Sequence, residues 1–182
     1  MKLRALAFAC ACALVVPAAL LAGENGSLVI PDFHALQREA TDSVNISLDP
    51  WLIRGASALM GDNDPDSVAM KRLLTGIESI QIRSFEFATD FVYPTAAIDV
   101  IRQQLTDPGW TRMVQVHNRK DRQDVDIYLK MEQNRAGGFA LIASEPRQLT
   151  IINIVGSMNM EDLPMLERHF HLAQFGLPTA GL

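Results

Sequence analysis

Hydrophobic and polar positions follow two different periods in the first half of the chain. Residues 43–48 alternate between aliphatic and polar side chains, and this period of two predicts a half-buried strand. Apolar side chains at helical spacing predict a helix over residues 33–40. An aspartate followed by a proline is a typical helix start, and it occurs twice, so we expect helices over residues 49–60 and 64–74.

A long strand is predicted next, at residues 78–87. Its two isoleucines share one face and its two phenylalanines share the other, which we read as a change of phase at Arg83-Ser84 and therefore as a bulge or a bend. A helix is then expected from Tyr93-Pro94 to about residue 105, because its apolar positions recur at helical spacing.

The second half predicts four strands with short polar connections, at residues 110–116, 124–131, 138–144 and 148–155. Short connections are typical of antiparallel hairpins, so these strands form a meander. In the second of them the odd positions are apolar, and we expect the even positions to face solvent. The fourth is apolar on both faces, which predicts a central position, and Gly156 is its expected end. A last helix is predicted after Asn159.

These elements predict an α+β fold with a mostly antiparallel sheet of five to seven strands and with helices packed on it. No repeat and no Pro/Gly/Ser-rich linker divides the chain, so we expect one domain over residues 26–172 and a loose tail over residues 173–182.

The first 22 residues have the organisation of a cleavable secretory leader. Lys2 and Arg4 form a basic start, residues 5–22 carry no charge, and the small residue Ala22 precedes the return of polarity. A membrane anchor is the alternative, but the apolar run is short for a membrane span and contains Pro17. We therefore expect export to the periplasm or the extracellular space, with association to the envelope left open.

Cleavage of this leader would remove both cysteines, Cys10 and Cys12, and with them any disulfide or thiolate site. Neither cysteine has the preceding leucine of a lipidation motif. The whole chain has 16 Lys and Arg against 21 Asp and Glu, and loss of Lys2 and Arg4 leaves 14 against 21, a formal charge of −7. An acidic domain without a basic run argues against nucleic-acid binding. No stretch after the leader is apolar enough to span a membrane.

Patterns for metal binding and catalysis are weak. Asp62, Asp64 and Asp66 have the spacing of a calcium loop, but Ser67 and Leu73 stand where glycine and glutamate are required, so we interpret the segment as an acidic turn that caps a helix. No nucleophile elbow and no phosphate loop occurs. The histidines lack zinc-ligand spacing; they are His34, His117, His169 and His171. We expect no catalytic residue, cofactor or metal.

Four side chains are candidates for ligand-binding or framework positions: Arg83, Glu86, Trp110 and Asn153. Asn153 interrupts an aliphatic strand, and a buried amide must be hydrogen-bonded, so we expect it to tie the sheet to the turn at residues 156–157. We expect Arg83 to pair with Glu86 or with a neighbouring strand.

Three stretches together resemble a bacterial family of exported proteins with a domain of unknown function. They are residues 43–48, 80–87 and 149–156, and Gly109-Trp110 with residues 125–130 fits the same order. The resemblance covers about residues 28–166. It implies a leader, no assigned activity, and for some members proximity to extracytoplasmic sigma-factor systems. It also implies that Trp110, Asn153 and Gly156 belong to the shared framework.

The leading hypothesis is a non-enzymatic exported domain that binds a protein partner or a small ligand in the cell envelope, with an envelope-stress or sigma-factor circuit as a candidate setting. A second hypothesis is a hydrolase-type enzyme whose site assembles in three dimensions from Arg83, Glu86, Asp90 and His117. A third is a structural or assembly role, in which exposed strand edges pair with other envelope proteins.

Overall fold

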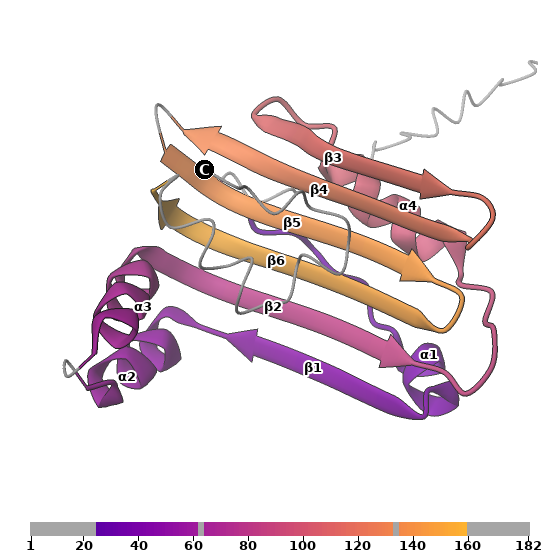
Figure 1. Ribbon diagram of the computed structural model, residues 1–182. Helices are drawn as coiled ribbons and strands as arrows, with labels where there is room; N and C mark the ends of the chain where they lie inside the picture. The colour runs from indigo at the N-terminus through magenta and orange to yellow at the C-terminus, as the bar shows by residue number, and fades with distance from the viewer. Residues whose placement is uncertain (1–24, 62–63, 133–134, 160–182) are drawn as a thin grey trace, which may run out of the picture.

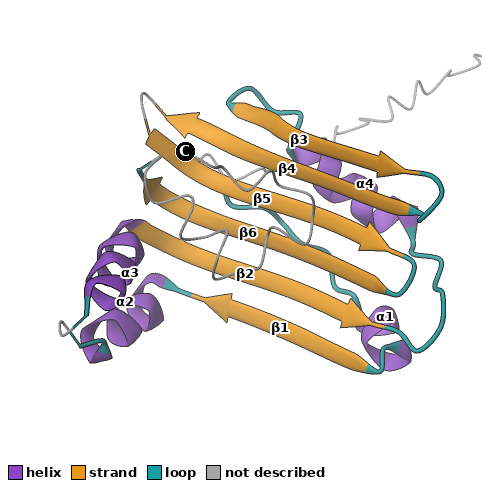
Figure 2. Cartoon of the chain, viewed as in Figure 1, coloured by secondary structure: helices purple, strands orange, loops and turns teal. Residues whose placement is uncertain are grey.

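The computed structural model describes residues 25–61, 64–132 and 135–159, and it contains ten helices and strands within them (Figures 1 and 2). In chain order they are α1 (His34–Glu39), β1 (Asp42–Leu48), α2 (Pro50–Leu59), α3 (Pro65–Gly76), β2 (Ile77–Glu86), α4 (Thr95–Gln104), β3 (Trp110–Asn118), β4 (Gln123–Glu132), β5 (Arg135–Glu145) and β6 (Gln148–Met158).

The strands form one six-stranded sheet in the order β1-β2-β6-β5-β4-β3, and every neighbouring pair is antiparallel. This confirms the predicted α+β class and the meander of the last four strands. β6 lies between β2 and β5, as its apolar character on both faces predicted. α4 lies in the connection that carries the chain from β2 to the opposite edge, where β3 begins (Figure 1).

Each face of the sheet carries its own apolar cluster. One face packs against α1, α4 and the segment that precedes α1, through Leu28, Leu36, Ile98 and Ile101. The other face packs against α2 and α3 at the end of the sheet where β2 begins, with Ile53 and Leu73 among its buried residues (Figure 2). The central strands therefore bury side chains in both directions.

Two buried amide side chains hold the segment before α1 against the sheet. Asn153 is fully buried; its Oδ1 accepts a hydrogen bond from Leu28 N at 3.0 Å, and its Nδ2 donates to Gly26 O at 3.2 Å. Gln104 brackets Val29 in the same way, accepting from its N at 2.8 Å and donating to its O at 2.9 Å. Side chains thus supply the hydrogen bonds that a neighbouring strand would give.

The predicted bulge at Arg83-Ser84 is wrong. β2 pairs in unbroken register with β1 and with β6 at these residues, and its register shift lies between Ile77 and Ser79. Ile80 and Phe85 already point to opposite faces in a regular strand, because their positions differ by an odd number. The apparent phase change arose because β2 is covered on one face at its start and on the other at its end.

Two further expectations also need correction. The even positions of β4 do not face solvent: Asp126 and Tyr128 are buried, because the face that they share lies under α4 and its neighbours. Gly156 does not end β6, which continues to Met158. Its φ is +139°, and a Cβ there would lie 2.3 Å from Gly76 O, so glycine is required by the close approach of the chain after α3.

Several predictions concern residues outside the described ranges. They are the leader over residues 1–22, the helix after Asn159, the end of the domain at residue 172 and the tail. Within the described ranges, none of the helices has the length and apolar character needed to cross a membrane.

Candidate functional site

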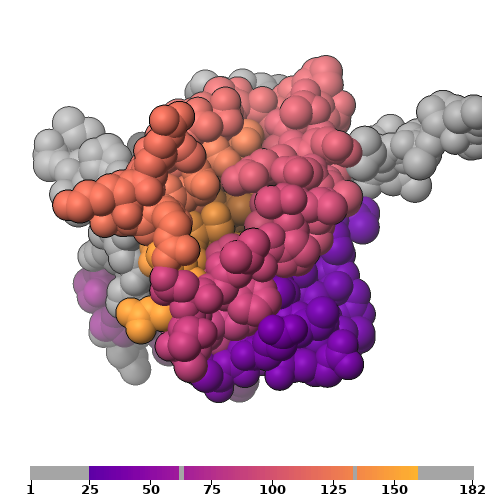
Figure 3. All heavy atoms as spheres, turned by 90° about the vertical axis from the view of Figure 1, so that its right-hand side faces the viewer, coloured from indigo at the N-terminus to yellow at the C-terminus, as the bar shows by residue number. Residues whose placement is uncertain are grey.

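An acidic cleft of about 530 Å³ lies at the end of the sheet where β2 finishes and the β5–β6 turn reverses the chain. Figure 3 views this end of the molecule, where the turn near residue 146 is recessed between the loop after β2 and the β3–β4 hairpin. The lining residues are Glu86, Phe87, Asp90, Glu145, Pro146, Arg147 and Gln148. Three acidic residues and one arginine therefore line this cleft.

The two walls of the cleft are tied to each other by the backbone. Phe87 N donates to Arg147 O at 2.9 Å, and Phe91 N donates to Pro146 O at 2.7 Å. The Tyr93 hydroxyl donates to the carbonyl oxygen of Glu145. Because these bonds join the loop after β2 to the β5–β6 turn, the shape of the cleft exists before any ligand enters it.

Aromatic rings support the same wall from inside. Phe87 and Phe91 stack with ring centroids 4.2 Å apart and an interplanar angle of 13°, and Tyr93 meets Phe87 edge-on at 5.8 Å. Burial, together with the negative charges of Glu145 and Asp90, raises the pKa of Tyr93 to about 12. The raised pKa of Tyr93 therefore indicates that this end of the sheet is partly shielded from solvent and carries negative charge.

The three carboxylates of the cleft differ in how they are engaged. Asp90 forms an ion pair with Arg122 from the β3–β4 hairpin, and Glu145 accepts a hydrogen bond from Gln123 Nε2 at 3.0 Å. Within the part of the chain that the structure describes, the Glu86 carboxylate has no hydrogen bond or ion pair. Glu86 is therefore the carboxylate in this cleft that is open to a cationic ligand.

Arg83 lines a second, smaller cleft of about 270 Å³ beside α1 and the edge strand β1, together with Asp32, His34 and Asn45. As expected, its guanidinium bonds to the neighbouring strand: Nη1 donates to Ile46 O at 2.7 Å, and Nη2 donates to Ser47 Oγ at 3.1 Å. Burial lowers the pKa of Arg83, and nearby Asp32 partly offsets that effect. The acceptors of the Arg83 guanidinium lie in β1 and β2, so its contacts are structural.

The four residues of the enzyme hypothesis do not line a single cleft. Glu86 and Asp90 share the acidic cleft, whereas Arg83 belongs to the cleft beside β1. His117 pairs with Asp124 across the start of the β3–β4 hairpin, and Arg119 Nε lies 3.4 Å from its other ring nitrogen. The geometry brings together two carboxylates without the proposed base or the proposed arginine.

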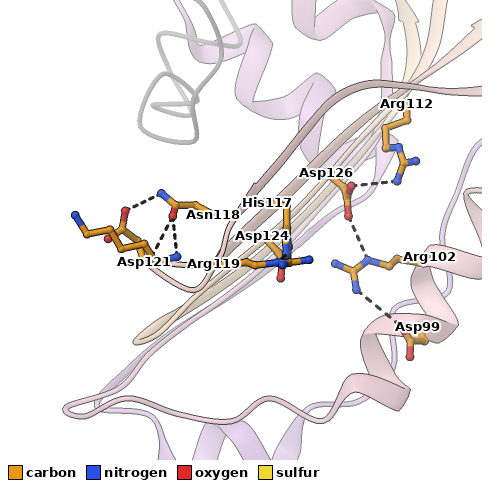
Figure 4. A network of polar contacts seen from close by, with 10 residues as sticks. Asp99, Arg102, Arg112, His117, Asn118, Arg119, Asp121, Asp124 and Asp126 are labelled. Atoms are coloured by element: carbon orange, nitrogen blue, oxygen red, sulfur yellow. Dashed lines mark hydrogen bonds and ion pairs between the residues drawn. The ribbon is translucent and has the colours of Figure 1, made fainter.

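A separate polar network fixes α4 to the sheet (Figure 4). The Asp126 side chain is only 7 % exposed and sits between two arginines, 3.2 Å from Arg102 Nε and 3.4 Å from Arg112 Nη1. Arg102 also approaches Asp99 at 3.7 Å, within the same helix. The two arginines and two aspartates cancel in charge, so the network pins a helix and offers no net field for a ligand.

Trp110 and Asn153, the other two candidates, serve the framework. Trp110 is partly buried and covers the position where Gly138 has no side chain; a Cβ at Gly138 would lie 2.9 Å from Trp110 Cη2. Asn153 is structural as expected, but it holds Gly26 and Leu28 and not the turn at residues 156–157. The partner was mistaken because the ordered segment before α1 lies more than a hundred residues away in sequence.

Sequence reasoning missed the Glu145 side of the acidic cleft. The sequence Glu145-Pro146-Arg147 predicts one of the short turns of the meander, and no local pattern relates it to Glu86. The register supplies that relation, because Glu86 pairs with Gln148 and Glu145 pairs with the same residue from the other side.

The acidic turn before α3 acts as the sequence predicted. Asp64 Oδ1 accepts a hydrogen bond from Ser67 N at 2.9 Å and caps the helix, and the Ser67 bonds lower the pKa of Asp64. In the described ranges, no three His, Cys, Asp or Glu side chains are grouped so as to hold a metal ion.

The family model described as "Domain of unknown function (DUF4252)" matches residues 37–166. The chain therefore belongs to this family, which confirms the resemblance to a family with a domain of unknown function. A comparison with curated proteins found no match. The matched region includes both clefts except for the segment that precedes residue 37.

Proposed function

We propose that this protein is a non-enzymatic exported domain that binds a cationic small ligand or a basic segment of a protein partner in the cell envelope. The acidic cleft is the binding site. The observation that carries the proposal is the Glu86 carboxylate, which stands without a partner among the described residues in a cleft whose two walls are tied together.

The chemistry of the cleft favours a cation. Glu86 and Glu145 carry negative charge that no arginine or lysine of the described chain neutralises directly, and Arg147 supplies the one positive charge in the lining. Phe87 and Pro146 add apolar surface beside these charges. A cleft of about 530 Å³ is within the usual size range of small-ligand sites. An organic ammonium group, free or on a lysine side chain, matches both the charge and the apolar wall.

The envelope enters the proposal through the leader pattern of residues 1–22 and the family resemblance. A sigma-factor or envelope-stress circuit is the setting in which such a sensor of extracytoplasmic cations or partners would act. Mass spectrometry of the protein recovered from the periplasm or the medium tests whether it is exported. We expect loss of residues 1–22. Recovery of the uncleaved chain from the membrane fraction would contradict it.

Binding is tested by calorimetric titration of the purified protein with spermidine and with a short lysine-rich peptide, with glutamate as the anionic control. Replacement of one carboxylate at an exposed site removes up to ~1 kcal/mol, so we expect Glu86→Gln to weaken binding about fivefold. Glu78→Gln, at the other end of the same strand, is the matched control and should bind like the unmodified protein.

Glu86→Gln should leave the melting temperature unchanged, because its carboxylate supports no contact among the described residues. Absence of binding to both cations would overturn the proposal, and so would equal weakening by the two variants.

A further inference from the structure

The two edges of the sheet are built differently. β3, at one edge, carries a register shift between Arg112 and Val114, which marks a bulge, and it presents Arg112 and His117. Bulges and charged side chains are the usual means by which an edge strand avoids pairing with another chain. β1, at the other edge, pairs with β2 in unbroken register over its whole length and contains no lysine, arginine or proline.

The contacts of Arg83 show which backbone groups of β1 face the open edge. One guanidinium nitrogen bonds to both Ile46 O and Ile82 O, at 2.7 Å and 2.9 Å, so these two carbonyls point into the space between β1 and β2. Hydrogen-bonding directions alternate along a strand. The N–H and C=O groups of Ser43, Asn45 and Ser47 therefore point away from β2, toward the edge.

The sequence of β1 is self-complementary about Asn45. It reads Ser43-Val44-Asn45-Ile46-Ser47, so an antiparallel copy centred on Asn45 meets like with like. Asn45 would lie opposite Asn45 of the second copy, Val44 opposite Ile46, and Ser43 opposite Ser47. The strand's one charged residue, Asp42, falls at the two far ends, where the two carboxylates stay apart.

We infer that β1 pairs antiparallel with β1 of a second copy of this chain, so that two sheets join into one across a two-fold axis at Asn45. Such an interface is isologous, because both copies use the same surface and every contact occurs twice. Val44 is 42 % exposed in the single chain and becomes covered by Ile46 of the second copy. The backbone groups of three residues in each copy gain hydrogen-bond partners.

The helices that flank β1 pack on opposite faces of the sheet. α1 precedes β1 and packs into the cluster on one face of the sheet through Leu36, whereas α2 follows β1 and packs into the cluster on the other face through Ile53 (Figure 1). In the pair, α2 of each copy comes beside α1 of the other at the same end of β1, but on the opposite face. The interface is short, so its dimer is expected to be concentration-dependent.

A substitution with opposite effects on the fold and on the dimer tests the inference. Asn45→Asp places a carboxylate opposite Arg83 within the chain, which favours the folded monomer. It also places two carboxylates directly opposite each other in the dimer. Like charges at opposed strand positions are destabilising, and we expect the dimer dissociation constant to rise ~10-fold. Thr111→Asp, at an exposed position of β3 that lies opposite the uncharged Leu129, is the control on the other edge.

The measurement is sedimentation velocity over a concentration series of the protein, with thermal unfolding of each variant alongside. We expect a monomer–dimer equilibrium that Asn45→Asp weakens and Thr111→Asp leaves unchanged, and partial recovery of the Asn45→Asp dimer in high salt. A separate Asn45→Cys variant should form a crosslink between two copies at that position under oxidation. A monomer at every concentration would overturn the inference, as would a dimer that Asn45→Asp leaves intact or that both substitutions weaken equally.

Discussion

Asn153 and Glu86 are polar residues on the adjacent strands β6 and β2, and their side chains differ in how far they are engaged. Asn153 is fully buried, and its amide is hydrogen-bonded to backbone groups of Gly26, Leu28 and Phe139. Glu86 stands at the end of β2, where its carboxylate has no partner among the described residues. A polar side chain in this fold is therefore available for a ligand only where the folded chain leaves its hydrogen-bonding groups without partners.

The same contrast separates the two clefts. In the cleft beside β1, Arg83 is engaged with the carbonyl oxygens and the Ser47 hydroxyl of its own sheet. In the acidic cleft, backbone hydrogen bonds of Phe87 and Phe91 join the two walls, so the Glu86 carboxylate is left without a partner among the described residues. Charge alone does not show whether a side chain has a structural role or is left without a partner; that depends on which groups make the structural hydrogen bonds.

The sharpest test of the buried side of this comparison is Asn153→Ala. It leaves Leu28 N and Gly26 O without their partner in the core, and unsatisfied buried groups cost ~1–3 kcal/mol each, so we expect a loss of about 3 kcal/mol in the free energy of unfolding. Denaturant unfolding measures it. Gln81→Ala is the control, because Gln81 lies directly opposite Asn153 on β2 and is only partly buried. Equal losses in both variants would show that the amide contacts carry no special weight.

Gly156→Ala tests whether disrupting a close backbone contact lowers the free energy of unfolding as much as removing the buried amide of Asn153. The new Cβ would meet Gly76 O and would sit on a residue with φ of +139°, so we expect a loss of about 2 kcal/mol. Gly55→Ala is the control, because nothing lies within 4 Å of that position in α2 and alanine favours a helix; it should stabilise by ~0.5–1 kcal/mol. Tolerance of alanine at residue 156 would mean that the chain after α3 can move away.

The smallest expected effect concerns Tyr93, which ties the acidic cleft. Its folded-state pKa is raised to about 12 from an ordinary 10.0. The folded state therefore retains this proton more tightly than the unfolded state. The contribution to stability is complete below pH 10 and is lost progressively as the pH rises from there to about 12.

Ultraviolet absorption titration follows this ionisation directly. The chain has two tyrosines, Tyr93 and Tyr128, so Tyr93→Phe leaves a single signal. We expect the variant to lose one high-pH transition and to show a shallower fall of stability between pH 10 and about 12. The pKa of Tyr128 is also raised by burial, and its transition serves as the internal reference. An unchanged pH dependence of stability in Tyr93→Phe would show that the pKa of Tyr93 is not raised in the folded state.

Most elements could be predicted from the chain because their signals are local. The alternation in β1, the two Asp-Pro helix starts and the short turns of the meander depend on neighbours within a few residues. The errors arose where burial depends on a distant segment. β2 and β4 were misread because the cover on each face comes from elements that are remote in sequence.

The candidate site was only half predictable for the same reason. Glu86 and Asp90 could be noticed in the sequence, but their opposite wall, Glu145 to Gln148, joins them only through the pairing of β2 with β6 and of β6 with β5. Arg83 and His117 were grouped with them by chemical type, and the register places each on a different part of the sheet.

Hydrophobic period and turn chemistry act locally, so the class of fold, the order of the strands along the chain, the central place of β6 and the self-complementary pattern of β1 follow from the amino-acid sequence. The tertiary structure sets which polar side chains have hydrogen-bond partners within the described chain and which have none. Asn153 is hydrogen-bonded to a segment that is distant in sequence, whereas Glu86 has no partner among the described residues. Whether a side chain is hydrogen-bonded depends on which distant backbone groups the fold brings next to it.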